Sequence, residues 1–148
     1  MLFHTRTKAS DIIRKKLVES GGTVTISLLD QKPCTIVVAD GGCAFTSDKL
    51  NKHRLKFDFS VFDVIVDLLK DSPEHRARKG NAHGKEDKVG YGKCTSDTVM
   101  GAVAIHYFGK SQGESCFDPI FVLAAVMDWA GVATNTRGYI QLKNVDLV

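Results

Sequence analysis

Apolar side chains recur at helical spacing in four segments of the chain, and a residue that stops a helix follows each one. The segments span about 8–20, 60–70, 95–108 and 119–130. In the last, Asp128 is the only charged side chain between Ile120 and Ala130, and Gly131 follows in a position suited to a left-handed cap. A helix that is apolar on all sides is buried on all sides. We therefore expect this fourth helix to lie at the centre of the fold.

Short segments of alternating apolar and polar residues lie between the first two helices and predict strands. They span 23–28, 34–39 and 42–46, and another strand is predicted over 137–142. The glycine-rich turn at 40–42 favours a hairpin between the second and third strands. The chain is therefore predicted to be α+β, an antiparallel meander of about three strands plus a C-terminal strand, packed with about four helices.

The turn lengths fix an expected register for the meander. A two-residue loop, Gly41-Gly42, places Val38 opposite Phe45, and a five-residue loop over 29–33 places Val24 opposite Val38. Both hairpins then collect their apolar side chains on one face. Cys43 falls on that face too, so we expect it to pack in the core rather than to act as a nucleophile.

Residues 73–94 differ in kind from the rest, because they are rich in glycine and charge and have few apolar side chains. The chain has 148 residues and globular composition, which fits a single domain over 1–148. A loop of about 20 residues inside a compact domain is uncommon and is usually functional or disordered. Residues 73–94, called here the basic segment, are therefore the first place to look for function.

Basic side chains are concentrated in that segment. From Glu74 to Lys93 there are six Lys or Arg and three Asp or Glu, a local charge of +3 that equals the net charge of the whole chain. Lysine and arginine neutralise phosphates, and glycine lets a backbone approach a ligand closely. The pattern of a P-loop is missing. The predicted nucleic-acid or anion-binding residues are Arg76, Arg78, Lys79, Lys85, Lys88 and Arg137.

A second basic cluster, Arg14-Lys15-Lys16, lies on the solvent side of the first predicted helix and is interpreted as a solvated face. The four cysteines include no C-x-x-C pair, which weakens zinc-ribbon and thioredoxin-type interpretations. His75, His83 and Cys94 match no known ligand spacing, so no metal site is predicted and no cofactor is named.

The N-terminal residues contain no apolar run suited to a signal peptide, and the longest apolar run, 120–127, is too short to span a membrane. We therefore expect a cytoplasmic protein with reduced thiols and no membrane partner.

The fourth helix together with the chain that follows it, Gly131 to Ile140, resembles the end of a winged helix: a last helix, a short strand, a turn and a returning strand. The resemblance covers about 25 residues. In a helix-turn-helix protein the last helix presents polar side chains to base edges. The fourth helix has almost none, so the resemblance implies that DNA would be met by Arg137 and the basic segment instead.

Three function classes follow from these patterns. The first is a nucleic-acid or phosphate-binding module that uses the basic segment. The second is an interaction or assembly subunit, including a homo-oligomer, in which the segment becomes ordered against a partner. The third is a small hydrolase-type enzyme with His83, Cys43 or His106 under the segment.

Overall fold

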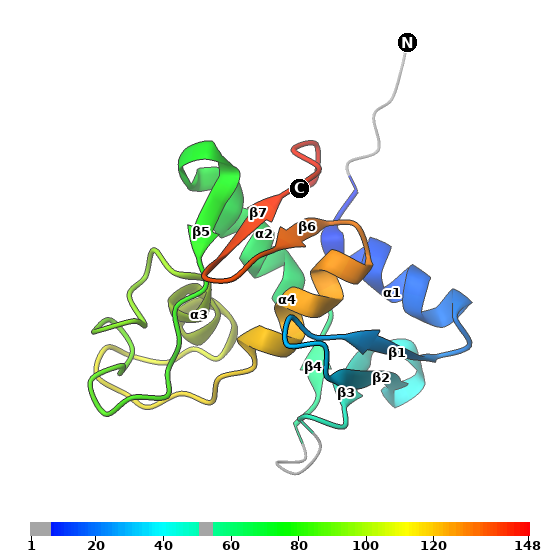
Figure 1. Cartoon of the computed structure of the whole chain (residues 1–148), viewed down its shortest axis with the longest axis horizontal. Coiled ribbons are helices and arrows are strands. Elements are labelled where there is room, and N and C mark those ends of the chain that lie inside the picture. The colour runs from blue at the N-terminus through cyan, green and yellow to red at the C-terminus, as the bar shows by residue number, and fades with distance from the viewer. Residues whose placement is uncertain (1–6, 51–54) are drawn as a thin grey trace.

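The computed structural model describes residues 7–50 and 55–148, and these form an α+β fold with two antiparallel sheets. Figure 1 shows the sheets on either side of the central helix α4. The helices are α1 (Ala9–Glu19), α2 (Val61–Asp71), α3 (Val99–Ala102), which continues as a π-helical turn (Val103–Tyr107), and α4 (Ile120–Trp129). The strands are β1 (Thr23–Ser27), β2 (Pro33–Ala39), β3 (Ala44–Ser47), β4 (Phe57–Asp58), β5 (Arg76–Arg78), β6 (Ala133–Asn135) and β7 (Tyr139–Leu142).

The predicted meander is confirmed and gains a strand, because β4 pairs with β3 to give the order β1-β2-β3-β4. Val38 lies opposite Phe45 as expected. The β1–β2 register is two residues away from the prediction, with Val24 opposite Ile36 rather than Val38. The loop has the expected five residues but occupies 28–32 and is closed by the Leu28 N–H, which donates to the Lys32 carbonyl over 3.0 Å. A shift of two keeps every side chain on its face, so the buried face is the predicted one.

Cys43 is exposed, so the prediction that it packs in the core is wrong. It follows a 3₁₀ turn (Asp40–Gly42) and has helical backbone angles, φ −87° and ψ −18°. The alternation of side chains along a strand therefore does not reach it. The core begins at its neighbours Ala44 and Phe45.

The second sheet contains the predicted C-terminal strand and two shorter ones, in the order β5-β7-β6. The hairpin β6–β7 confirms the helix, strand, turn and returning strand of the wing-like ending. The strand β5 corrects the expectation of an irregular stretch from residue 73, since its Ala77 pairs with Ile140 on β7. The irregular stretch runs from 79 to 98 instead.

The central helix α4 is buried as predicted. Its buried side chains run from Ile120 to Met127, apart from Phe121, which is exposed together with Asp128. The helix packs against β1 of one sheet and β6 of the other. Because only Phe121 and Asp128 of α4 are exposed, the helix does not present the row of polar side chains with which a recognition helix reads base edges in a major groove.

The helix before α4 begins later than the sequence predicts. The sequence predicts a start near residue 95, but the helix begins after Thr98, whose hydroxyl accepts the hydrogen bond from the Gly101 N–H over 3.0 Å. Gly101 has no space for a Cβ, because the Thr95 carbonyl packs directly against it. The chain that leaves the basic segment is thereby pressed against the first turn of α3.

Candidate nucleic-acid interface

Two arginines lie on the outward face of the three-stranded sheet. Arg76 and Arg78 are two residues apart on β5, so they share a face, and Ala77 between them is buried on the other face. Their partners on β7 are Gln141 and Tyr139. These four residues, Arg76, Arg78, Tyr139 and Gln141, are called here the basic sheet face.

Tyr139 lies opposite Arg78 on this face and also contacts Arg76. The Arg76 guanidinium lies 5.1 Å from the centroid of the Tyr139 ring, which is cation–π distance. Arg76 also contacts Glu74, with 3.2 Å between guanidinium and carboxylate. A hollow of 520 Å³ lies beside the ring and is lined by Pro73, Glu74, Arg76, Ala77, Arg78 and Tyr139. We call it the Tyr139 hollow, and its volume is ordinary for a ligand site.

A second cavity borders the first at Arg78. It has a volume of 460 Å³ and is lined by Arg78, Lys79, Gly80, Asn81, Gly92, Lys93, Thr95, Asp97, Thr98 and Gly138. We call it the loop pocket. Three of its side chains are basic and one is acidic. The acid, Asp97, accepts a hydrogen bond from the Thr95 hydroxyl over 2.5 Å. The pocket therefore carries an excess of positive charge together with hydroxyl and backbone groups.

Lys79 is half-buried at the junction of three elements. Its backbone N–H donates to the Gly138 carbonyl over 2.8 Å, and its backbone carbonyl accepts from the Met100 N–H over 2.9 Å. Burial lowers the pKa of the Lys79 ammonium to about 8, since removal from water disfavours the charged form. An anion in the loop pocket would favour the charged form again.

Two glycines of the segment are required for its internal packing. Gly80 has φ +65°, and a Cβ there would overlap the Lys93 carbonyl and the Thr98 side chain. Gly92 has φ +56°, and a Cβ there would overlap Asp87 and the Glu86 carbonyl. Close approach to a ligand was the expected role of these glycines. In the structure they allow parts of the segment to pack closely against each other. The Asn81 N–H donates to the Lys93 carbonyl over 3.0 Å and stabilises this packing.

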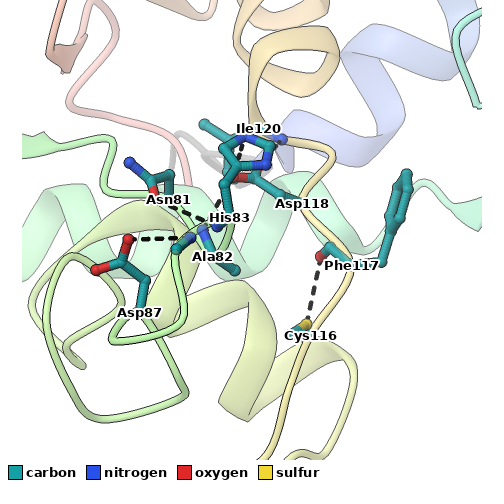
Figure 2. A network of polar contacts seen from close by, with 9 residues as sticks. Asn81, Ala82, His83, Asp87, Cys116, Phe117, Asp118 and Ile120 are labelled. Carbon is teal, nitrogen blue, oxygen red and sulfur yellow. Dashed lines mark hydrogen bonds and ion pairs between the residues drawn. The ribbon is translucent and has the colours of Figure 1, made fainter.

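Asp118 ties the segment to the start of α4, as Figure 2 shows. Its Oδ2 accepts from the Ala82 N–H over 3.1 Å and lies 3.1 Å from His83 Nε2, while its Oδ1 accepts from the Ile120 N–H over 3.0 Å. The Asp118 side chain is 5% exposed and the His83 side chain 69% exposed. One buried carboxylate thus accepts from the first backbone N–H of α4 and from the basic segment, and so holds the two together.

A second carboxylate closes the outer part of the segment. Asp87 accepts from the Gly84 N–H over 3.2 Å and from the Lys93 N–H over 2.8 Å. The Val89 N–H donates to the Glu114 carbonyl over 3.0 Å. These bonds give residues 79–98 a defined path along the neighbouring chain.

The six predicted basic residues do not all come together. Arg76, Arg78 and Lys79 lie on or beside the two cavities, and Arg137 precedes Gly138 of the loop pocket. Lys85 and Lys88 line neither cavity: Lys85 is exposed in the outer part of the segment, and the Lys88 ammonium donates to the Ser115 hydroxyl over 2.5 Å.

Lys93, Thr95, Thr98 and Tyr139 belong to the site and were not predicted. Lys93 was included in the charge count of the segment, but the sequence does not show that the turn at Gly92 brings it to the pocket that Lys79 lines. Tyr139 was assigned to a strand without a role, and its position became visible only through its pairing with Arg78.

The basic cluster on α1 is bound to the protein itself. Arg14 Nε donates to the Gly42 carbonyl over 2.6 Å. The Lys16 ammonium donates to the Trp129 carbonyl over 2.5 Å and lies 4.7 Å from the centroid of the indole. Lys15 is exposed and lies 4.0 Å from Glu19. Two of these three cations therefore stabilise the packing of α1.

The candidate catalytic groups lie in different surroundings. His83 contacts Asp118, Cys43 lies in the turn before β3, and His106 borders a separate 300 Å³ cavity with Asp67 and Asp71. Within residues 7–50 and 55–148, no group of three or more His, Cys, Asp or Glu side chains is placed to hold a metal ion. None of the helices in these ranges is long and apolar enough to cross a membrane.

Comparison of the chain with protein-family models, curated proteins and solved structures finds no match. Function is therefore inferred from the arrangement of the residues described above.

Proposed function

We propose that the protein binds nucleic acid by its phosphate backbone, using Arg76, Arg78, Lys79, Lys93 and Arg137. The observation that carries the proposal is the place of Arg78, which lines both cavities and so joins the basic sheet face to the loop pocket. Around the two cavities four basic side chains stand against two acidic ones, Glu74 and Asp97. Contiguous positive charge with hydroxyl and backbone groups between is the typical surface for a phosphodiester chain.

The partial burial of Lys79 supports the same proposal. Keeping an ammonium in a partly desolvated position costs stability, as its lowered pKa indicates. For a lysine that binds no ligand, this position would lower stability without a compensating interaction. A phosphate beside Lys79 and Lys93 would offset that cost, because an opposite charge nearby favours the ammonium form.

The other two function classes have less support in the described residues. The internal bonds of residues 79–98 provide an ordered path without a partner, and the assembly hypothesis was built on partner-induced order. The hydrolase hypothesis needs a nucleophile next to a histidine, and Cys43 lies in the turn before β3 whereas His83 lies in the basic segment beside Asp118.

The test is fluorescence anisotropy with a labelled 12-nucleotide DNA at several salt concentrations. Three to four phosphate contacts predict that log K falls with log[salt] with a slope of about −2 to −3. Arg78→Gln is expected to weaken binding about 10- to 150-fold at low salt, since a hydrogen bond to a charged group contributes about 1.5–3 kcal/mol.

A matched pair of lysine variants provides the control. Lys93→Gln removes a charge from the loop pocket and is expected to weaken binding. Lys15→Gln removes the same charge from α1, which lines neither cavity, and is expected to leave binding unchanged. It should also leave the fold intact, because the 4.0 Å pair of Lys15 with Glu19 is exposed and contributes little to stability. Equal effects of the two substitutions, or no binding at low salt, would refute the proposal.

A further inference from the structure

We propose that the strand bound at this surface is single-stranded, and that one of its bases stacks at Tyr139 while the adjoining phosphate enters the loop pocket. This inference rests on the proposed function and specifies its substrate class. Three features of the molecule support it: the position of Tyr139, the boundary between the two cavities, and the burial of α4.

Tyr139 is placed as an aromatic platform on a basic surface. It stands on the outward face of the sheet beside Arg78 and 5.1 Å from the Arg76 guanidinium, and it borders a hollow of 520 Å³. Proteins that bind single strands combine a basic groove with aromatic rings on which bases stack, and arginine planes serve as further stacking partners. The Arg76 guanidinium lies over the Tyr139 ring, so the two groups begin a stack that a base could extend.

The two cavities provide for different parts of one nucleotide. The Tyr139 hollow offers an aromatic ring and a proline beside its arginines and Glu74. The loop pocket offers lysines, hydroxyls and glycine backbone, which suit a phosphate. Because Arg78 lines both, a base in the first cavity and a phosphate in the second would be neighbours along one chain.

The rest of the surface favours a single strand over a duplex. A base within a duplex is stacked on its neighbours and is not free to stack on Tyr139. Duplex readers place a helix or strand pair in a groove. The helix of this chain that precedes the β6–β7 hairpin, α4, is buried between the two sheets and exposes only Phe121 and Asp128, so it has no polar face that could enter a groove.

The experiment compares four probes on the wild-type protein by anisotropy. They are a 12-nucleotide deoxythymidine strand, the same length with abasic sites, a 12-base-pair duplex, and inorganic polyphosphate. We expect the thymidine strand to bind about 5- to 50-fold more tightly than the abasic strand, as one stacked base predicts. We expect it to bind more tightly than the duplex as well.

Substitutions of Tyr139 separate stacking from charge. Tyr139→Leu is expected to lower thymidine-strand affinity about 5- to 50-fold while leaving the salt slope unchanged, and Tyr139→Phe to retain most of the affinity. Arg78→Gln is expected to reduce the salt slope by about 0.7. Phe121→Leu, a substitution of another exposed aromatic ring, is the control and should change neither quantity.

The two proposals fail in distinguishable ways. Salt-dependent binding that is equal for the thymidine strand, abasic strand and duplex would overturn the stacking inference and leave phosphate binding in place. Absence of binding to any of the four probes at low salt would overturn both. The probe comparison uses the wild-type chain, so its outcome decides between these cases even if Tyr139→Leu fails to fold.

Discussion

Removing the Asp118 carboxylate should release the basic segment from α4. Asp118→Ala leaves the N–H groups of Ala82 and Ile120 without their acceptor. Hydrogen bonds to a charged acceptor contribute about 1.5–3 kcal/mol each, and the exposed contact with His83 adds at most about 1 kcal/mol. Because such contributions are not additive, we expect a loss of about 3–4 kcal/mol in the free energy of unfolding. In a chain of this length that corresponds to a decrease in Tm of about 6–16 °C.

Two further variants divide this effect between the three contacts. Asp118→Asn retains an oxygen for the Ile120 N–H but turns its amide towards the Ala82 N–H and His83, so a loss of about 1–2 kcal/mol is expected. His83→Gln removes only the contact with the 69% exposed side chain and should cost less than about 1 kcal/mol.

Urea denaturation followed by the fluorescence of Trp129, the only tryptophan, measures these free energies. Hydrogen exchange locates the effect, and faster exchange should be confined to residues 79–98 and the first turn of α4. Wild-type stability in Asp118→Ala, or an exchange increase spread evenly over β1–β3, would refute the role assigned to this carboxylate.

Three other predictions concern the loop pocket. Lys79→Met should raise Tm at pH 7, because it removes a partly buried ammonium, and should weaken oligonucleotide binding. A variant with lower Tm and weaker binding would contradict the view that the buried ammonium costs stability. Binding by the wild-type protein should weaken as pH rises through about 8, where the Lys79 ammonium of the free protein loses its proton, whereas Lys79→Met should show no step between pH 7 and 9. Gly80→Ala should destabilise the fold by about 2 kcal/mol or more. A φ of +65° costs an L-residue about 1–2 kcal/mol, and the added Cβ also overlaps the Lys93 carbonyl. An unchanged urea denaturation curve would show that the backbone at Gly80 adapts without strain.

Helical periodicity and turn residues predicted most of the architecture. The central position of α4 followed from its lack of a polar side, and the left-handed Gly131 at φ +76° ended it as expected. The meander followed from alternation and the turn at 40–42. These features depend on residues close together in sequence, which is why a pattern along the chain was sufficient.

The β1–β2 register shows where local pattern becomes insufficient. Loops of 28–32 and 29–33 have the same length and bury the same face, so alternation does not distinguish them. In the observed register Leu28 and Lys32 form the closing hydrogen-bonded pair, and Pro33 opposite Ser27 takes a position between such pairs. The absent N–H of proline is not needed there.

The candidate site depended on contacts between distant segments. The charge count pointed to residues 73–94, and the basic residues nearest β5 do gather around the two cavities. The charge count could not show that β5 pairs with β7. That pairing places Tyr139 beside Arg78, although about 60 residues of chain separate them. Nor could the charge count separate Lys93, which the turn at Gly92 brings back to Lys79, from Lys85 and Lys88, which line neither cavity.

The most direct test of the interface is a map of amide chemical shifts during titration with the 12-nucleotide deoxythymidine strand. The largest changes are expected at residues 76–81, 92–98 and 137–141, which line or border the Tyr139 hollow and the loop pocket. The amides of α1 and of β1–β3 should change little. Shifts centred on α1 or the four-stranded sheet, or none at saturating strand concentration, would contradict the assignment of this surface to nucleic-acid binding.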